Sequence, residues 1–529
     1  MPSKKLLRDL QAIVLAGSLI TGTRSVAQAQ AASKLAHPGP DGKLVYVGDA
    51  KGNTILDFSN CGYQGGGVKL PTVKAKITVT PEPGDGDATA RIQKAIDELS
   101  RMPLDKEGFR GAVMLKRGTY RIEKNLTIAA SGVVLRGEGQ GEDGTVLVGT
   151  GKAERVLVQV KGAQGVVESP GTQQAIIDKH VPVGARQVTV TSAAGFKVGD
   201  TVLVRRVGNR AWIHYIKMDQ IALRPSDPTS TKQWSPFDLD FDRVITGIEG
   251  NQIALDAPIP CAIEQDWGGG RIMKYKDGGR IEQVGVENLR GESEFDKSIT
   301  AKQGNKTYYS DEKHALGLLS FANVKNAWAR DLTAVHFYHG VVHAGSGAKW
   351  VTVQDSSALD PVSVITGGRR YPYYNTGAQL VLMQRCYAKG ERHAFAFGSH
   401  VCGPNVFLAC RSEEDYATSE PHHRWSVGGL YDTVQAQMAF QDRQFMGTGH
   451  GWAGANYVAW NCEGTLVCQQ PSTAQNYAIG FIGKKEPGAF KRLDGYWESQ
   501  GQHVAPASLY LKQLEDRLGR EAVANALTK

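Results

Sequence analysis

The chain has 529 residues, of which 62 are glycine and 22% are charged, and its formal net charge is +8 at pH 7. This composition excludes a disordered chain and a coiled coil, and it favours an ordered, turn-rich, all-β protein. The length allows two or three ordinary domains or one elongated repetitive domain, whose core grows with its length.

Residues 1–29 have the pattern of a secretory signal peptide. Lys4, Lys5 and Arg8 precede a short apolar run, and Ala27-Gln28-Ala29 matches the small-x-small cleavage pattern. The run is too short to span a bilayer comfortably, and no later segment approaches that length. Without residues 1–29 the net charge is +5, which suits an acidic polysaccharide better than nucleic acid for an exported protein. We expect a secreted or periplasmic protein without a membrane span.

A capping helix is predicted near the start of the mature chain. Residues 30–83 are predicted to form an N-terminal extension, and residues 84–180 to hold this helix and the first coils of a solenoid. Ile92, Ala95, Ile96 and Leu99 fall on one helical face, with Asp87 or Thr89 as N-cap. Such a helix would cover the open end of the first coil.

Three further segments follow. Residues 181–263 alternate apolar and polar residues between Gly-Asp and Gly-Asn turns, which predicts an inserted small β subdomain. Residues 264–490 are predicted to form the main solenoid with the active site. Residues 491–529 are predicted to be a helical tail, because Leu511, Leu514 and Leu518 recur at helical spacing.

Strand-length apolar segments recur along the chain at roughly 20 to 30 residues, which is the signature of a solenoid. They lie near Val133, Val284, Val324, Val351, Val381, Val406 and Val458. Cys386, Cys410 and Cys462 are separated by 24 and 52 residues, or one repeat and then two. We interpret them as small buried residues of an interior ladder. Because the chain has seven cysteines, at least one thiol is unpaired or bridged to another chain.

The segments GAVMLKRGTY and GVVLRGEG, with the later blocks RHAFAFGSHVCGPNVFLAC, HHRWSVGGLYD and GTGHGWAGANYVAWNC, resemble the pectate-lyase-like superfamily, in particular an exported bacterial branch of uncertain substrate. The resemblance implies a single-stranded right-handed parallel β-helix with an N-terminal capping helix, a small β insertion and a C-terminal helix. This fold hosts lyases, glycoside hydrolases, esterases and non-catalytic phage and surface proteins, so the activity has to be argued from the site.

A column of polar residues follows from the repeat. His400, Arg424 and His450 are 24 and 26 residues apart, which is the interval of the cysteines, and one repeat before His400 lie Tyr373 and Tyr374. Residues one repeat apart in a solenoid lie about 4.8 Å apart along its axis. The phase is known to about three residues, so it leaves open whether His422 or His423 faces outward.

Such a column suits β-elimination on a uronate, which needs a cation on the carboxylate, a base near C5 and an acid for the leaving oxygen. The predicted catalytic residues are His400, His423, Arg424, His450, Tyr374 and His393. The predicted substrate-binding residues are Arg369, Arg370, Tyr373, Arg392, His422, Trp425, Trp452 and Asn456. We therefore expect a lyase acting on an acidic polysaccharide.

Two alternatives stay open. A glycoside hydrolase would use two carboxylates, drawn from Asp311, Glu312, Asp355, Asp360, Glu391, Asp415, Asp432 and Asp442. A non-catalytic carbohydrate-binding protein would stack sugars on Trp425, Trp452, Tyr373 and Tyr374.

No cofactor and no metal ligand is predicted. Calcium is a lesser possibility, because Glu413-Glu414-Asp415 is contiguous and neighbouring strand residues face opposite sides. Whether the protein is a monomer or a trimer is left open.

Overall fold

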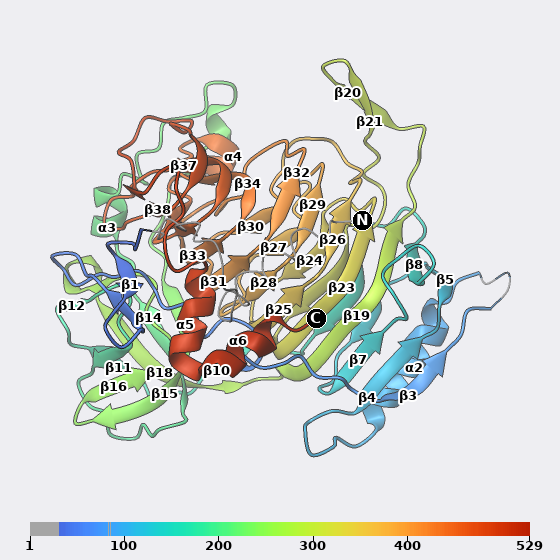
Figure 1. Cartoon of the computed structure of the whole chain (residues 1–529), viewed down its shortest axis with the longest axis horizontal. Helices are drawn as coiled ribbons and strands as arrows, with labels where there is room; N and C mark the ends of the chain where they lie inside the picture. Colours follow the sequence, from blue (N-terminus) through green and yellow to red (C-terminus); the bar gives the residue numbers. More distant parts are fainter. Residues whose placement is uncertain (1–30, 83, 85) are drawn as a thin grey trace, which may run out of the picture.

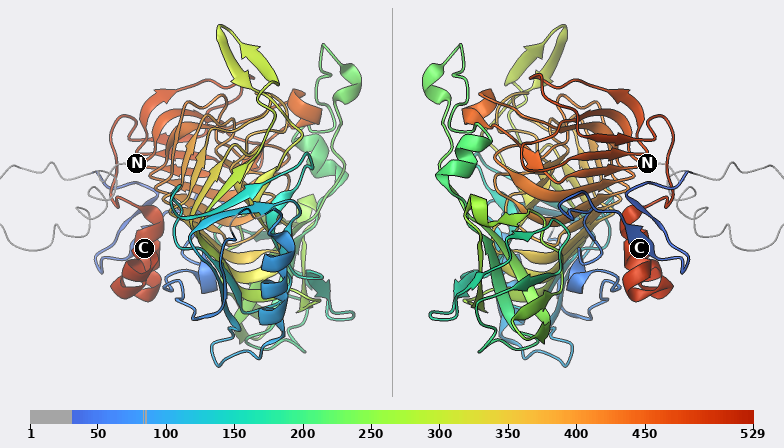
Figure 2. Two further views of the ribbon diagram at one scale, coloured as in Figure 1. Left: turned by 90° about the vertical axis from the view of Figure 1, so that its right-hand side faces the viewer. Right: turned by 90° about the vertical axis from the view of Figure 1, so that its left-hand side faces the viewer.

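The computed structural model describes residues 31–529 apart from positions 83 and 85, so the predicted signal peptide lies outside the described residues. The chain is mostly β, and its strands lie side by side in a stack (Figure 1). Strands from the N-terminal part lie at one end of the stack, and strands from the C-terminal part lie at the other end. The views in Figure 2 show the same stack from its two sides. No helix in the described part is long and apolar enough to cross a membrane.

Three parallel sheets make up the stack. The first contains β3 (Ala75–Val79), β4 (Gly111–Leu115), β7 (Val133–Arg136), β19 (Ile281–Ser293), β23 (Val324–Val335), β25 (Lys349–Gln354), β28 (Leu382–Gln384), β31 (Cys402–Leu408), β33 (Ser426–Asp432), β35 (Gly454–Ala455), β36 (Val458–Trp460), β38 (Tyr477–Ile479) and β40 (Tyr496–Glu498). The second contains β5 (Gly118–Ile122), β8 (Thr145–Gly149), the later halves of β19 and β23, β26 (Ser357–Leu359), β29 (Tyr387–Lys389), β32 (Arg411–Glu413), β34 (Gln435–Phe440), β37 (Glu463–Cys468) and β39 (Ile482–Lys485). The third contains β6 (Leu126–Ile128), β9 (Val156–Lys161), β22 (Gly317–Ala322), β24 (Gly340–Ala344), β27 (Tyr373–Asn375) and β30 (Phe395–Phe397).

The register confirms the predicted repeat. In the first sheet Thr352 pairs with Leu382, Leu382 with Val406, and Val406 with Leu430. The last two pairs are 24 residues apart, which is the interval between Cys386 and Cys410, and the first is 30 residues apart, within the predicted range of 20 to 30. The structure therefore confirms a mostly β chain with large parallel sheets.

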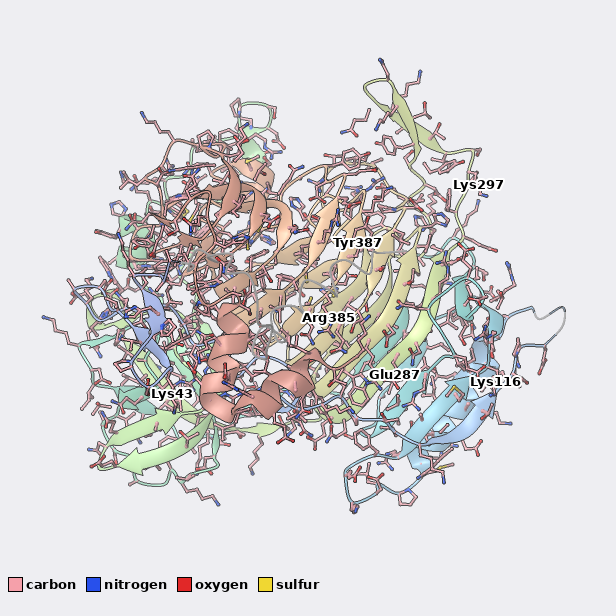
Figure 3. The ribbon with its side chains drawn as sticks, in the orientation of Figure 1. Lys43, Lys116, Glu287, Lys297, Arg385 and Tyr387 are labelled. Atoms are coloured by element: carbon pink, nitrogen blue, oxygen red, sulfur yellow. The ribbon has the colours of Figure 1, made fainter. Side chains whose placement is uncertain are left out.

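A ladder of left-handed residues bends the chain between the first and second sheets. Asn288, Asp331, Asp355, Arg385, Ala409, Thr433 and Asn461 all have φ between 49° and 56°. A single left-handed residue turns a strand sharply, and Asn and Asp tolerate that conformation best among residues with a side chain. Arg385 of this ladder is labelled in Figure 3 on the face of the stack turned to the viewer.

The interior of the stack holds apolar ladders. Cys386, Cys410 and Cys462 are buried, as the repeat predicted, and their thiols are free. Beside them, Tyr373 stacks on Phe395 with ring centroids 5.7 Å apart. Each such aromatic contact contributes about 0.5 to 1.5 kcal/mol beyond the area it buries.

The predicted capping helix is α2 (Thr89–Arg101), which packs against β3, β4 and β6. Ile92, Ala95, Ile96 and Leu99 are all buried in the main core. The Asp87 carboxylate accepts hydrogen bonds from the backbone amides of Thr89 and Glu123, so it ties the start of the helix to the second sheet. The first strand of the stack, β3, lies within residues 30–83, the predicted N-terminal extension.

The insertion is an antiparallel structure that is longer than residues 181–263. Its strands are β10 (Val166–Glu168), β11 (Gln174–Ile176), β12 (His180–Val181), β13 (Gln187–Thr189), β14 (Thr201–Arg206), β15 (Leu239–Glu249), β16 (Gln252–Leu255), β17 (Ile263–Glu264) and β18 (Gly270–Asp277). The insertion starts before residue 181 because β10 and β11 pair with β18, which is the last strand of the insertion. A helix, α3 (Arg210–Tyr215), and two 3₁₀ turns, η2 (Pro228–Ser230) and η3 (Gln265–Trp267), belong to its loops.

Buried charges fix the insertion to the stack. Asp242 on β15 accepts hydrogen bonds from Lys349 at 2.7 Å, Tyr275 at 2.6 Å and Arg280 at 3.0 Å. Burial alone would raise the pKa of Asp242, but Lys349 and Arg280 hold it below its usual value. The carboxylate is thus a charged link between two parts of the chain.

The C-terminal tail consists of β40 and two helices, α5 (Leu509–Leu518) and α6 (Arg520–Leu527). Leu514 is buried and Leu511 packs against the same cluster, whereas Leu518 is 47% exposed. The helices pack beside the η1 turn (Tyr63–Gly65) and the outside of the first sheet, where Tyr510 donates a hydrogen bond to the Cys61 carbonyl. A short hairpin of β1 (Ala36–Pro38) and β2 (Leu44–Tyr46) lies nearby.

Candidate active site

The outer face of the third sheet carries three polar residues in register, Ser320, His343 and Tyr374. Ser320 pairs with His343, His343 with Tyr374, and Tyr374 with Ala396. The exposed His343 ring stacks on Tyr374 at 5.5 Å. Because successive strand residues face opposite sides, Tyr374 faces outward while Tyr373 faces the core.

Tyr371 lies at the centre of the cluster, two residues before β27. Its ring is 4.8 Å from both Tyr374 and His393. Its hydroxyl is 2.9 Å from Nε2 of His422, which belongs to a segment bonded to the turn after β30. Residues that are 51 positions apart in the sequence therefore share a hydrogen bond.

His422 and His423 extend this contact into a chain. Their Nδ1 atoms are 3.1 Å apart, and the half-buried His423 ring lies 4.9 Å from His450. A neutral imidazole has one donor and one acceptor nitrogen, so each of the two hydrogen bonds holds one proton and can run in either direction. Tyr371, His422 and His423 thus form a path along which a proton can move.

Beneath this path lies a buried ion pair. Arg443 donates to Glu420 Oε1 at 2.6 Å and to the His422 carbonyl at 2.8 Å. His393 donates from Nδ1 to the Thr418 carbonyl at 2.6 Å, which fixes its tautomer. The other nitrogen, His393 Nε2, is buried and has no hydrogen-bond partner among the described residues, so it holds a free lone pair.

The histidines of this cluster are uncharged at neutral pH. Burial, with the nearby Arg424 and Arg443, lowers the pKa of His423 to about 3, and burial, with Arg443, lowers that of His450 to about 2. Burial and Arg443 likewise hold the pKa values of His393 and His422 well below 6.5. Burial raises the pKa of Tyr371 to about 12, so the phenol stays protonated.

Two arginines border the cluster with part of their surface exposed. Arg424 donates to the Thr448 carbonyl at 3.0 Å and to its hydroxyl at 2.8 Å. Arg392 donates to the Gly367 carbonyl, and its positive charge opposes the rise that burial causes in the pKa of Tyr371. Both keep donors that can meet an anion, since a guanidinium has five N–H groups.

The predicted stacking of His400, Arg424 and His450 is found in the backbone. The His400 amide donates to the Arg424 carbonyl at 2.9 Å, and the Arg424 amide donates to the His450 carbonyl at 3.1 Å. The His400 ring, however, packs on Phe237 of the insertion at 4.0 Å. Its side chain therefore lies against the insertion, whereas His423 and His450 contact each other.

The structure contradicts a substrate-contacting role for several predicted residues. Tyr373 and Trp425 are fully buried, the former among core aromatics and the latter against Trp212 of the insertion at 5.0 Å. Trp452 is buried in the same cluster as Trp425, so stacking on sugars is excluded for all three in this conformation. Tyr373 is buried because it faces the interior of the stack, and the two tryptophans are buried because the insertion packs over them.

Three other predicted residues serve structural contacts. Arg370 is buried and donates to the Ser363 and Gly390 carbonyls. Arg369 forms a two-bond ion pair with Glu312 at 2.7 and 2.9 Å. Asn456 is buried and donates to the Pro260 carbonyl. Of the predicted arginines, this leaves Arg392 and Arg424 beside the cluster.

One group in the described part of the chain has metal-ligand spacing. His393, Glu420 and His422 each offer a ligand atom within 4.8 Å of the others. Two imidazoles and a carboxylate are a zinc-type donor set and a poor calcium set, since calcium prefers oxygen. In this structure the Arg443 guanidinium bonds the Glu420 oxygen and both His422 nitrogens are in hydrogen bonds, so an ion would have to displace these contacts.

The acidic run 413–415, considered for calcium, does not converge. Glu413 accepts from the Tyr387 hydroxyl, Glu414 pairs with Lys389, and Asp415 accepts from Ser412. The three carboxylates thus have separate partners.

A carboxylate pair does occur at the bend between the first and second sheets. Asp331 and Asp355 directly follow the paired residues Arg330 and Gln354, so they stack in successive turns. Arg385 binds Asp355 through two hydrogen bonds of 2.8 and 2.7 Å. Burial and the Asp355 charge raise the pKa of Asp331 to about 6.

Sequence reasoning missed Tyr371, Glu420, Arg443 and His343. Tyr371 has a signal in the sequence, since it lies 22 residues before His393 and so falls close to one repeat. Arg443 and Glu420 are 23 residues apart, which is again one repeat. Pairing charged residues at the repeat interval would have found this ion pair.

No family model matches the chain, and no curated protein matches it. Among solved structures, the alginate lyase of Paenibacillus sp. FPU-7 aligns at 10% identity and a TM-score of 0.32, covering 82% of this chain and all of that one. The A-module of a mannuronan C-5 epimerase of Azotobacter vinelandii aligns at 10% identity and 0.32, covering 80% and 96%. The tailspike of the Acinetobacter baumannii phage AP22, solved with a capsular saccharide, aligns at 10% identity and 0.36, covering 76% of this chain.

The chain spans 56% of the AP22 tailspike and 59% of a Geobacillus virus E2 protein. With TM-scores this low, these alignments carry no weight for activity, and the function has to rest on the side chains described above.

Proposed function

We propose that the protein is an exported enzyme that cleaves a uronate-containing polysaccharide by β-elimination, and that its parallel sheets wind as one right-handed β-helix. The observation that carries the proposal is the hydrogen-bonded path Tyr371–His422–His423, flanked by Arg392 and Arg424. It supplies a protonated phenol, neutral imidazoles and guanidinium donors in one place. These are the groups that elimination next to a carboxylate requires.

Arg424 is the proposed partner of the substrate carboxylate. A guanidinium that binds this carboxylate stabilises the negative charge that develops when the C5 proton leaves. Arg424 neighbours His423 in sequence and reaches solvent, so it can hold a uronate over that imidazole. Arg392 offers a second cation on the side of Tyr371.

His423 is the proposed base and Tyr371 the proposed acid. The His423 imidazole takes the C5 proton, the C4–O4 bond breaks as the C4–C5 double bond forms, and the Tyr371 hydroxyl gives its proton to O4. These transfers leave a charged His423 and a Tyr371 phenolate. Because His422 bridges both residues, a proton can pass from His423 Nδ1 through His422 to the phenolate, which leaves all three groups neutral with the two imidazoles in the opposite tautomer. Exchange of the outer His423 proton with water then resets the tautomers.

The proposal is tested by incubating the purified protein with pectic, alginate, glucuronan and glycosaminoglycan polymers. A lyase creates an unsaturated product that absorbs in the ultraviolet, whereas a hydrolase releases only new reducing ends. Absence of ultraviolet absorbance on every uronate polymer, with reducing ends released from another glycan, would overturn the proposal.

Glycoside hydrolysis is the second candidate, and the pair Asp331 and Asp355 favours it. A hydrolase needs one protonated and one ionised carboxyl group. Asp331 has a raised pKa, and Arg385 binds Asp355 as a carboxylate. A non-catalytic carbohydrate-binding protein would give neither product in the same assay.

A requirement for a cofactor is not part of the proposal. The acidic run 413–415, which was considered for calcium, has its three carboxylates on separate partners.

A further inference from the structure

A two-stranded hairpin projects from the body of the molecule. It consists of β20 (Thr300–Gln303) and β21 (Lys306–Tyr309), which pair antiparallel around a Gly304-Asn305 turn. Figure 1 shows it standing clear of the stack at the upper right, and both views of Figure 2 show the same projection. An isolated two-stranded hairpin buries little surface, so it contributes little to the core.

The hairpin has a one-sided charge. Residues 297–309 contain three lysines, Lys297, Lys302 and Lys306, and no acidic residue. All three are exposed, and none forms an ion pair with a residue that the structure describes. Lys297 is labelled in Figure 3 beside the segment that leads into the hairpin. Exposed Ile299 and Tyr309 add apolar surface next to this charge.

Specific contacts anchor the base of the hairpin beside the candidate active site. The Tyr308 hydroxyl accepts a hydrogen bond from the Ile365 amide, and the Arg370 guanidinium lies 5.6 Å from the Tyr308 ring. Just after the hairpin, Glu312 forms the two-bond ion pair with Arg369. The loop that makes these contacts leads directly into Tyr371, and its carbonyls bind Arg392.

We propose that this hairpin is a binding arm for an extended polyanion, and that it holds segments of an acidic polysaccharide outside the reacting sugar. At low ionic strength, lysines without an acidic partner attract a polyanion. The exposed Tyr309 offers a ring on which a sugar can stack. This inference rests on the proposed function for its ligand class. It adds that the enzyme acts on polymers in preference to short oligosaccharides.

The test compares two triple variants with the same loss of charge. The first is Lys297→Ala/Lys302→Ala/Lys306→Ala. The matched control is Lys43→Ala/Lys94→Ala/Lys106→Ala, which removes three exposed lysines that are also unpaired among described residues. Lys43 lies on the opposite side of the molecule in Figure 3. Both proteins are full length, and circular dichroism melts verify that both fold.

Binding of polygalacturonate and alginate is measured by affinity electrophoresis at low and high salt. We expect the hairpin variant to bind about tenfold more weakly at low salt, with a shallower salt dependence, and the control to bind within about twofold of the original protein. On a cleaved substrate, we expect a higher KM for the polymer with unchanged kcat, and no change for a short oligosaccharide.

Equal binding by the two variants, or failure of the unaltered protein to bind either polymer, overturns the inference. The outcome is separable from that of the proposed function. Binding that depends on the hairpin without any unsaturated product would retain the arm and reject the lyase, while turnover that ignores the hairpin would do the reverse.

Discussion

Two regions on either side of the second sheet offer different chemistry. The cluster around Tyr371 and His422 contains a phenol and neutral imidazoles joined by hydrogen bonds, with arginines beside them. The bend at Asp331 and Asp355 contains two carboxyls, one with a raised pKa and one bound by Arg385. The first arrangement moves protons through neutral groups, which suits elimination, and the second separates an acid from a carboxylate, which suits hydrolysis.

The difference arises from local backbone. At the bend, the left-handed conformation selects Asp and Asn, so carboxyls occur there for structural reasons as well. The backbone at His393, His422, His423 and His450 is not left-handed, so the backbone conformation does not select histidine at these positions. The concentration of these histidines is therefore the stronger functional indication, together with the His393 and His450 nitrogens that have no hydrogen-bond partner among the residues described.

The largest expected effect comes from removing one hydroxyl. Tyr371→Phe deletes the proposed acid and breaks the bond to His422, so we expect kcat to fall by about 10²- to 10⁴-fold. Tyr373→Phe is the matched control, because that hydroxyl donates to the Tyr387 carbonyl inside the stack and does not contact the Tyr371 cluster through a hydrogen bond that the described residues show. Initial rates by ultraviolet absorbance measure both, and equal rates in the two variants would remove Tyr371 from the mechanism.

Arg424→Ala tests the carboxylate contact. Loss of a donor that stabilises the developing charge should lower kcat/KM by about 10²- to 10³-fold with the fold intact. Arg411→Ala, which removes an exposed arginine of the second sheet, serves as the comparison. Near-normal turnover of Arg424→Ala would exclude it as the carboxylate partner.

The pH dependence separates the two regions. Burial, with Arg424 and Arg443, lowers the pKa of His423 to about 3, so its imidazole remains a base as the pH falls to about 5. A hydrolase that relies on protonated Asp331 would instead lose activity, about tenfold per pH unit, as the pH rises through about 6. Profiles of kcat/KM from pH 4.5 to 8 decide between them, and a decline above pH 6 would favour the bend.

Asp331→Asn should change the rate by less than about threefold if the Tyr371 cluster is the active site. Asparagine also adopts the left-handed conformation at this position, so the bend should be retained. A loss of a hundredfold or more in released reducing ends would assign the chemistry to the carboxyl pair.

Chelation should have the smallest effect. Because hydrogen bonds already occupy the donor atoms of Glu420 and His422, we expect activity after EDTA dialysis to stay within about twofold. Loss of activity that zinc or calcium restores would show that an ion displaces these contacts.

The repeat could be predicted from the sequence because apolar residues recur at a fixed interval, and the cysteines gave its phase. The same periodicity correctly stacked His400, Arg424 and His450 in the backbone. It could not tell Tyr373 from Tyr374, since adjacent strand residues face opposite sides and the phase was known to about three residues.

Contacts between distant segments were beyond this reasoning. Trp425 is buried because Trp212, more than two hundred residues earlier, packs against it. The link between Tyr371 and His422 spans two turns of the stack, so it depends on side-chain direction as well as on the interval.

The seven buried thiols allow local unfolding to be measured from the rate at which each cysteine is labelled. Burial raises the pKa of groups such as Cys386 and Cys61, so a thiol-reactive dye meets them as poor nucleophiles until the surrounding structure opens. Cys61 lies in the cluster beside the terminal helices, Cys261 and Cys402 lie where the insertion docks, and the other four lie within the stack. The order in which these sites acquire label would therefore rank the opening free energies of three separate layers of the protein.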